Sequence, residues 1–145
     1  MNIQIQSAQT QHRAGLEILL SANALPVSDL PASLNGFYLA LDGEAVVGAA
    51  GMEHWDNVGL LRSVAVAESH RNHHIARQLT DTVLSHARKA QVQEIYLITN
   101  TADRYFEKYG FQRVDRSEVP ESIAQTEQFA GLCPSSAVVM KMTLR

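Results

Sequence analysis

Residues 60–79 read LLRSVAVAESHRNHHIARQL, which is an apolar run, a polar turn and the start of an amphipathic segment. The nearly continuous apolar character of Leu60–Ala67 predicts a strand that is buried on both faces. Over 75–90, apolar side chains recur every four residues, which predicts a helix with one buried face. The turn between them is rich in basic side chains: His70, Arg71, His73 and His74. A cationic loop is therefore expected directly before a helix N-terminus.

A helix N-terminus presents unpaired N–H groups and a partial positive charge, which suit a phosphate group. Arg71 and Arg77 would add charge-assisted hydrogen bonds there. The residues alone leave two interpretations open: a site for an anionic, pyrophosphate-bearing ligand, or a solvated surface turn. A metal site at His70, His73 and His74 is a third interpretation, but clustered loop histidines are usually exposed and structural zinc demands four ligands, so we expect no metal.

The composition is that of one globular domain, which we expect to span residues 1–145. The net charge of -3 argues against a nucleic-acid partner. The single cysteine, Cys133, cannot form an internal disulfide, which fits a reducing compartment, and we interpret it as a packed residue rather than a nucleophile. Without a signal segment or a run of about 18 apolar residues, we expect a cytoplasmic protein that does not enter a membrane.

The remaining predicted elements are further strands and helices. Alternation predicts a first strand over Asn2–Gln6, and Thr10 is expected to cap a helix over Thr10–Asn23. The dipeptide Asp42-Gly43 predicts a hairpin. The expected hairpin strands are Phe37–Leu41 and Ala45–Met52, and the later elements are strands over Glu94–Ile98, Phe111–Arg116 and Ala137–Leu144 and helices over Ala102–Tyr109 and Glu121–Phe129. This order predicts a mixed α/β domain.

Two segments resemble the GNAT family of acyl-CoA N-acetyltransferases. The strand residues Val64-Ala65-Val66, followed by HRNHHIARQL (70–79), are similar to the family's pyrophosphate motif R-x-x-G-x-G/A, with Arg71 first and Ala76 last. The stretch TNTADRYFEKYGF (99–111) is similar to the family's strand-to-helix segment beside the pantetheine arm. The resemblance covers nearly the whole chain. It implies the GNAT fold, a central and mostly antiparallel sheet with a splay, flanked by helices.

The resemblance also implies acetyl-CoA or coenzyme A as the cofactor. The backbone of Val64, Ala65 and Val66 would pair with the pantetheine amides, and N–H groups in the loop would hold the diphosphate. The expected cofactor contacts in the loop and beyond it are Arg71, Asn72, His73, His74, Ile75, Ala76, Arg77, Thr99 and Phe106.

Within the family, LRSVAV (61–66) and the tail 119–134 resemble the arsenic-resistance N-acetyltransferase subgroup, and 99–120 is similar to the acetyltransferase domain of N-acetylglutamate synthases. This implies direct acetyl transfer, in a ternary complex, to a small amine that also carries an acidic group, such as an amino acid or an organoarsenical analogue. Arg62 is a candidate for binding that acidic group, or it pairs with an acidic neighbour such as Glu53. His54 is a second candidate for substrate binding. Relatives of this type are commonly dimers, so a homodimer is possible.

Three positions depart from the family pattern. His74 stands at the first glycine of the phosphate motif, and we expect the loop to bind with this imidazole turned outward. Leu60 stands where many members carry a glutamate, so Glu53 is the best replacement as general base, or it is only an exposed acid. Phe106 stands where a tyrosine often protonates the thiolate, and the nearby phenols are Tyr105 and Tyr109. These departures leave open an alternative, a coenzyme A-binding or sensing module with impaired catalysis.

Overall fold

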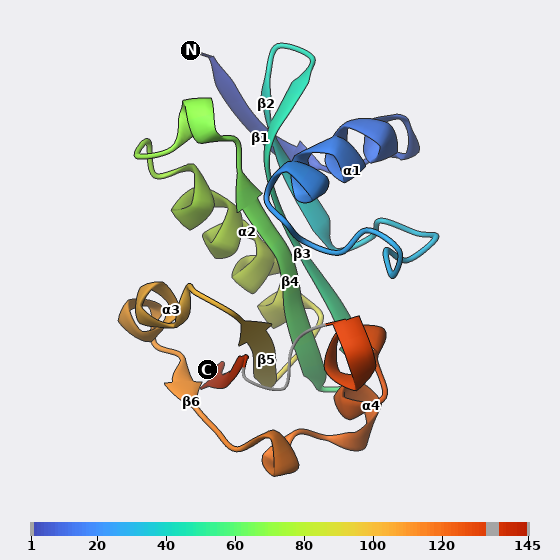
Figure 1. Cartoon of the computed structure of the whole chain (residues 1–145), viewed down its shortest axis with the longest axis vertical. Coiled ribbons are helices and arrows are strands. Elements are labelled where there is room, and N and C mark those ends of the chain that lie inside the picture. Colours follow the sequence, from blue (N-terminus) through green and yellow to red (C-terminus); the bar gives the residue numbers. More distant parts are fainter. Residues whose placement is uncertain (1, 133–136, 145) are drawn as a thin grey trace. The chain divides into compact units, whose positions relative to one another are not determined.

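The computed structural model describes residues 2–132 and 137–144, which are drawn in colour in Figure 1. The chain forms two compact units. One unit comprises the residues up to Met52 together with Arg62–His86, and the other comprises Glu53–Leu61 and the residues from Ala87 onward. Each unit is described by itself.

The first unit begins with a strand that leads into a helix. Its elements are β1 (Ile3–Ser7), the 3-10 turn η1 (Thr10–His12), α1 (Arg13–Ala22), β2 (Phe37–Asp42), most of β3 (Ala45–Trp55), the end of β4 (Val58–Val66), the 3-10 turn η2 (Glu68–His70) and most of α2 (Ile75–Lys89). Because side chains alternate across a strand, β2 serves two cores. Phe37, Leu39 and Leu41 join the cluster that buries α1. On the other face, Tyr38 contacts His86 of α2.

The second unit is built around β5 (Glu94–Thr99). Its other elements are α3 (Asp103–Tyr109), β6 (Gln112–Arg113), the 3-10 turn η3 (Arg116–Glu118), α4 (Glu121–Ala124), the π-helical turn η4 (Gln128–Leu132) and β7 (Val138–Thr143). Its core cluster contains Leu60, Tyr96, Val119, Ile123, Phe129 and Val139. Leu60 is fully buried in this cluster, so the strand predicted to be buried on both faces is packed as expected.

The strand order is β1-β2-β3-β4-β5-β7-β6. The pairs β1–β2, β2–β3, β5–β7 and β6–β7 are antiparallel, and β4 is parallel to β5. The parallel pairing joins Val58–Leu60 to Glu94–Tyr96, whereas β4 continues to Val66 and β5 to Thr99. Pairing limited to the start of two longer strands is the hydrogen-bond pattern of a splay. The predicted fold class, a mostly antiparallel sheet with a splay and flanking helices, is confirmed.

Several predicted boundaries are wrong. The strand expected over Phe111–Arg116 is only Gln112–Arg113, and the helix expected over Glu121–Phe129 ends at Ala124. Thr10 is the first residue of a 3-10 turn, not the cap. Gln9 occupies the cap position, and its backbone N–H donates to Nδ1 of His12 over 3.0 Å. Propensity and period locate such short elements poorly because tertiary contacts decide their ends.

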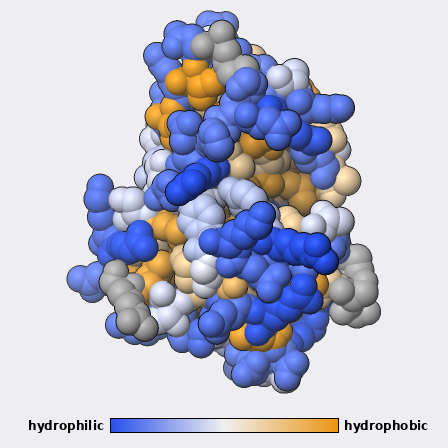
Figure 2. Space-filling view, turned by 90° about the vertical axis from the view of Figure 1, so that its left-hand side faces the viewer, coloured by the Kyte–Doolittle hydropathy of each residue, from blue (hydrophilic) through white to orange (hydrophobic). Residues whose placement is uncertain are grey.

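Hydrophobic side chains reach the visible surface in separate spots between hydrophilic ones, as Figure 2 shows for one face. Among the described residues, the large hydrophobic side chains that stand out are Ile18, which is 72% exposed, and Tyr105, which is 38% exposed. No helix in the described part of the chain is both long and apolar enough to cross a membrane.

The pairing of Gly51 with Phe37 allows a direct test of the first unit's core. Phe37 is fully buried, and a Cβ added at Gly51 would lie 2.3 Å from its ring. We predict that Gly51→Ala lowers the free energy of unfolding by about 1–3 kcal/mol, because the ring must move within a close-packed core. Gly131→Ala is the matched control, since a Cβ there meets no atom within 4 Å. Urea unfolding of both variants measures the difference, and equal midpoints would contradict the packing.

Candidate active site

Strand β4 is distorted in its interior at Ser63. This buried residue has φ 58°, in the left-handed region that residues other than glycine rarely adopt. Such conformations cost of order 1–3 kcal/mol each, and they cluster at functional sites. Ser63 directly precedes Val64, Ala65 and Val66, the residues expected to pair with pantetheine. Serine is not one of the residues that favour this conformation, so the sequence carries no signal for this distortion.

Arg62 is held by a carboxylate of the protein itself. Its Nη2 donates to Oδ1 of Asp29 over 2.8 Å, its Nη1 to the Asp29 carbonyl over 3.2 Å and its Nε to Oγ of Ser63 over 3.1 Å. The two charged side chains are only 2% and 5% exposed. The guanidinium carbon also lies 5.9 Å from the centre of the Phe37 ring. Asp29 lies between α1 and β2, so this pair ties that connection to β4.

The buried pair predicts an unequal response to the loss of two acids in the same unit. Asp29→Ala would remove the carboxylate of Asp29 from a buried guanidinium, and we expect it to lower the free energy of unfolding by about 3–5 kcal/mol. Glu17→Ala removes the acid of an exposed pair, Glu17 with Arg13 at 3.5 Å, and should cost about 0–1 kcal/mol. Chemical unfolding compares them. A loss no larger for Asp29→Ala than for Glu17→Ala would show that the buried pair does not hold the connection.

The loop from Ala67 to His74, here called the β4–α2 loop, leads from β4 into α2. Asn72 has φ 69° and His74 has φ 61°. His74 thus takes, at the motif's glycine position, the backbone conformation that glycine adopts most readily. The His74 side chain is exposed, and its outward orientation in a loop that binds the cofactor stays a prediction. Gln78 donates to the His74 carbonyl over 3.1 Å, so the N–H groups of 75–77 precede this first helical bond, where helices bind anions.

Arg71 is also engaged within the protein. Its Nη2 donates to Oδ1 of Asn23 over 2.9 Å and its Nε to the Val66 carbonyl over 3.3 Å. Asn23 is the C-cap residue of α1. These bonds use two of the five N–H donors of a guanidinium. The phosphate contact expected for Arg71 stays a prediction.

The strain at His74 predicts that glycine there is favourable. We expect His74→Gly to keep or raise both stability and coenzyme A affinity, because left-handed backbone costs a non-glycine residue about 1–2 kcal/mol. His73→Gly is the matched control: His73 is exposed like its neighbour, but its φ is not among the positive values. His73→Gly should therefore lower stability, because glycine adds backbone freedom there without relieving any strain. Calorimetric titration with coenzyme A decides, and a large loss of affinity in His74→Gly alone would mean that the imidazole contacts the cofactor.

The candidate base and its neighbour lie near the end of β3. Glu53 is partly buried and His54 is exposed. Successive strand residues point to opposite faces of a sheet, so these two side chains cannot both face the same side. The roles of Glu53 as base and of His54 as a substrate contact stay predictions.

Helix α3 carries the candidate acids. Phe106 is buried and packs edge-on against Phe111, with ring centres 5.6 Å apart. The Tyr105 ring lies 5.1 Å from Phe106 and 6.3 Å from Tyr109. Gly110 ends the helix with φ 112°, which explains why glycine stands there. Phe106 therefore belongs to the unit's core, and the two tyrosines flank it on the same short helix.

The predicted site residues fall into two groups. The first unit holds Arg62, Val64, Ala65, Val66, Arg71, Asn72, His73, His74, Ile75, Ala76 and Arg77, and the second holds Glu53, His54, Thr99, Tyr105, Phe106 and Tyr109. In the second unit, Oγ1 of Thr99 accepts from the backbone N–H of Ala102 over 3.0 Å, so Thr99 shapes the approach to α3. The described residues, His70, His73 and His74 included, contain no group of three His, Cys, Asp or Glu that could hold a metal ion. Cys133 lies outside the described residues.

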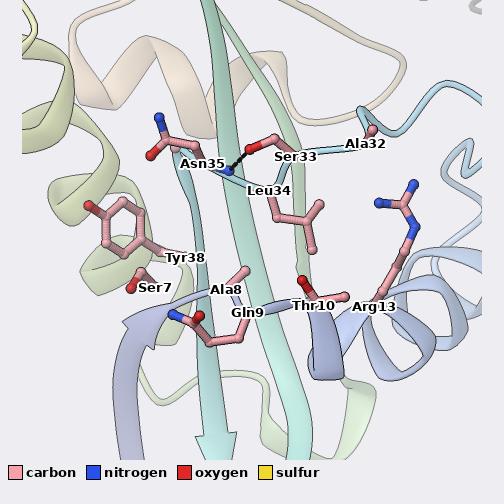
Figure 3. A pocket seen from close by; sticks show the side chains of 11 residues that line it. Ser7, Ala8, Gln9, Thr10, Arg13, Ala32, Ser33, Leu34, Asn35 and Tyr38 are labelled. Atoms are coloured by element: carbon pink, nitrogen blue, oxygen red, sulfur yellow. Dashed lines mark hydrogen bonds between the residues drawn. The ribbon is translucent and has the colours of Figure 1, made fainter.

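The first unit also contains a pocket of about 340 Å³ that the sequence did not indicate (Figure 3). Its lining comes from the end of β1, the start of α1, the segment before β2 and Tyr38. Arg13 lies at its edge, but its Nη1 and Nη2 donate to the carbonyls of Pro31 and Leu30 over 2.8 and 3.3 Å. The other polar lining groups are hydroxyls and amides: Ser7, Gln9, Thr10, Ser33, Asn35 and Tyr38. This chemistry suits a neutral polar group.

Comparison with known families identifies the chain. The model of the acetyltransferase (GNAT) domain matches residues 33–113, more than half of the 145 residues. The chain belongs to the GNAT family. The match spans Arg62, the β4–α2 loop and the segment from Thr99 to Gly110. The family predicted from these segments is confirmed. No curated protein matches the sequence.

Solved structures share this GNAT fold. N-acetylglutamate synthase from Neisseria gonorrhoeae, complexed with coenzyme A and N-acetyl-glutamate, superposes with a TM-score of 0.86 at 16% identity, over 100% of this chain and 36% of that one. This chain thus spans about a third of that enzyme. A GNAT acetyltransferase from Staphylococcus aureus superposes with a TM-score of 0.82 at 22% identity, over 99% of this chain and 100% of that one. A Mycobacterium tuberculosis protein in complex with CoA and NLQ superposes with a TM-score of 0.78 at 18% identity, over 98% of this chain and 99% of that one. The cofactor expected for this GNAT chain is the one bound in two of these three structures.

Proposed function

We propose that this GNAT protein transfers the acetyl group of acetyl-CoA to the amine of a small amino acid or an amino-acid-like molecule, such as an organoarsenical analogue. The observation that carries the proposal is the β4–α2 loop. Its glycine position holds a left-handed backbone although the residue there is His74. A loop of this shape before the N-terminus of α2 suits a diphosphate.

The chain's own groups would act on the amine and the thioester. Acetyl-CoA supplies a thioester whose C–S bond breaks as the amine nitrogen bonds to the carbonyl carbon. A backbone N–H beside the distorted Ser63, in Val64–Val66, would stabilise the negative charge on the carbonyl oxygen. Glu53 is the proposed acceptor of the amine proton, directly or through water. Tyr105 or Tyr109 would donate a proton to the departing thiolate.

Two observations bear on the substrate class: the ligand of one solved neighbour and the surroundings of Arg62. The Neisseria gonorrhoeae structure is named as a complex with N-acetyl-glutamate, and this chain is similar to only a third of that protein. In this chain, the guanidinium of Arg62 already has the Asp29 carboxylate as a partner. A substrate carboxylate at Arg62 would therefore share the guanidinium with Asp29. Residues 1–145 acting as one domain, the homodimer and the cytoplasmic location also stay proposals.

A thiol-release assay tests the function. With acetyl-CoA and a panel of amino acids that includes arsenical analogues, we expect at least one amine to stimulate release of coenzyme A with saturation. Calorimetric titration with coenzyme A on the same sample supplies the reference. If coenzyme A binds and no amine stimulates release, the chain is a binding or sensing module. If it does not bind, the proposed function fails.

A further inference from the structure

The β4–α2 loop is held by side chains outside the family motif. Nε2 of His70 lies 2.9 Å from Oδ2 of Asp42, and Nδ1 of His70 lies 2.7 Å from Oγ of Ser69. Asp42 ends β2, next to the hairpin glycine Gly43. The pair therefore connects the start of the loop to a hairpin that is far away in the sequence.

This connection is partly shielded from water. The side chain of His70 is 16% exposed and that of Asp42 is 33% exposed. The hydrogen bond from His70, assisted by the N–H of Asn2, lowers the pKa of Asp42 below its usual value. The carboxylate is thus charged at neutral pH, and hydrogen bonds to charged groups are stronger than those between neutral ones.

The loop needs such a connection because its own backbone is strained. Asn72 and His74 both lie in the left-handed region, and neither is glycine. Three contacts hold the residues just before them: Ala67 N–H to the Val47 carbonyl at 2.8 Å, His70 to Asp42, and Arg71 to Asn23. They reach β3, β2 and the end of α1. A loop fastened to three elements keeps an anion-binding shape before the ligand arrives, which lowers the cost of binding.

We infer that Asp42, through His70, is a positioning residue that holds the β4–α2 loop in the shape that receives the diphosphate of coenzyme A. This inference rests on the proposed function for the identity of the ligand. Neither Asp42 nor His70 belongs to the family's phosphate motif, and Asp42 acts on the ligand only through His70 and the loop backbone.

Three variants isolate the effect of this pair. Asp42→Ala removes the acceptor, and Asp42→Asn keeps an oxygen that accepts a hydrogen bond from Nε2. Glu44→Ala removes the same charge from an exposed position in the same hairpin. We expect Asp42→Ala to weaken coenzyme A binding about ten-fold or more, the effect of losing one hydrogen bond to a charged group. Asp42→Asn should recover most of the affinity, and Glu44→Ala should bind like the unmodified protein.

The ligand comparison separates positioning from general destabilisation. Pantetheine lacks the diphosphate, so its affinity, measured by calorimetry at high concentration, should be the same in Asp42→Ala and the unmodified protein. Equal weakening of both ligands, or no weakening of coenzyme A, would overturn the inference while leaving the proposed function standing. If the unmodified protein binds no coenzyme A, the proposed function fails.

Amide hydrogen exchange tests the loop without any ligand. Asp42→Ala should accelerate exchange over residues 70–78, and Glu44→Ala should not. Unchanged exchange in Asp42→Ala would overturn the positioning role.

Discussion

Backbone strain between β4 and α2 is the constraint on which the site depends. Of the described non-glycine residues with positive φ, three lie within twelve positions: Ser63, Asn72 and His74. Left-handed backbone costs such residues roughly 1–2 kcal/mol each, so the segment keeps this shape only if its surroundings hold it. The buried pair of Arg62 and Asp29 holds the start of the segment, and the contacts of His70 and Arg71 hold its middle.

The first unit supplies this support by burying its helices on opposite faces of one hairpin. The residues of β2 that face α1 alternate with those that face α2, so a single strand fixes both helices. Gly48 brings α2 close to β3, because a Cβ there would lie 3.0 Å from the side chains of Ile75 and Leu79. The N-terminus of α2 is therefore set by core packing near its first residue. Because these N–H donors are already ordered, a ligand binds to them at a lower entropic cost than it would to mobile donors.

The sequence predicted the elements that have a strong period and missed the contacts between distant segments. The hairpin at Asp42-Gly43, the long helix from Ile75 and the buried strand β4 were readable because periodicity and turn chemistry are local. The partners of Arg62 and His70 were not readable, since Asp29 and Asp42 are 33 and 28 positions away. The fold brings Asp29 to Arg62, and no local pattern indicates that contact, whereas the pairing of Arg62 with Glu53 stays a prediction. The left-handed conformation of Ser63 could not be predicted either, because serine has no particular preference for positive φ.

The two departures from the family pattern in the second unit share one physical consequence. Leu60 is fully buried among Tyr96, Ile123 and other core residues, and Phe106 packs on Phe111. An apolar side chain at each position therefore stabilises the core where a polar one would need a hydrogen-bond partner. If acetyl transfer proceeds here, less of its rate comes from a dedicated acid and base and more from positioning and backbone donors. An amine that is already largely neutral at the working pH would need the least help from a base, so this site favours a substrate whose amine has a low pKa.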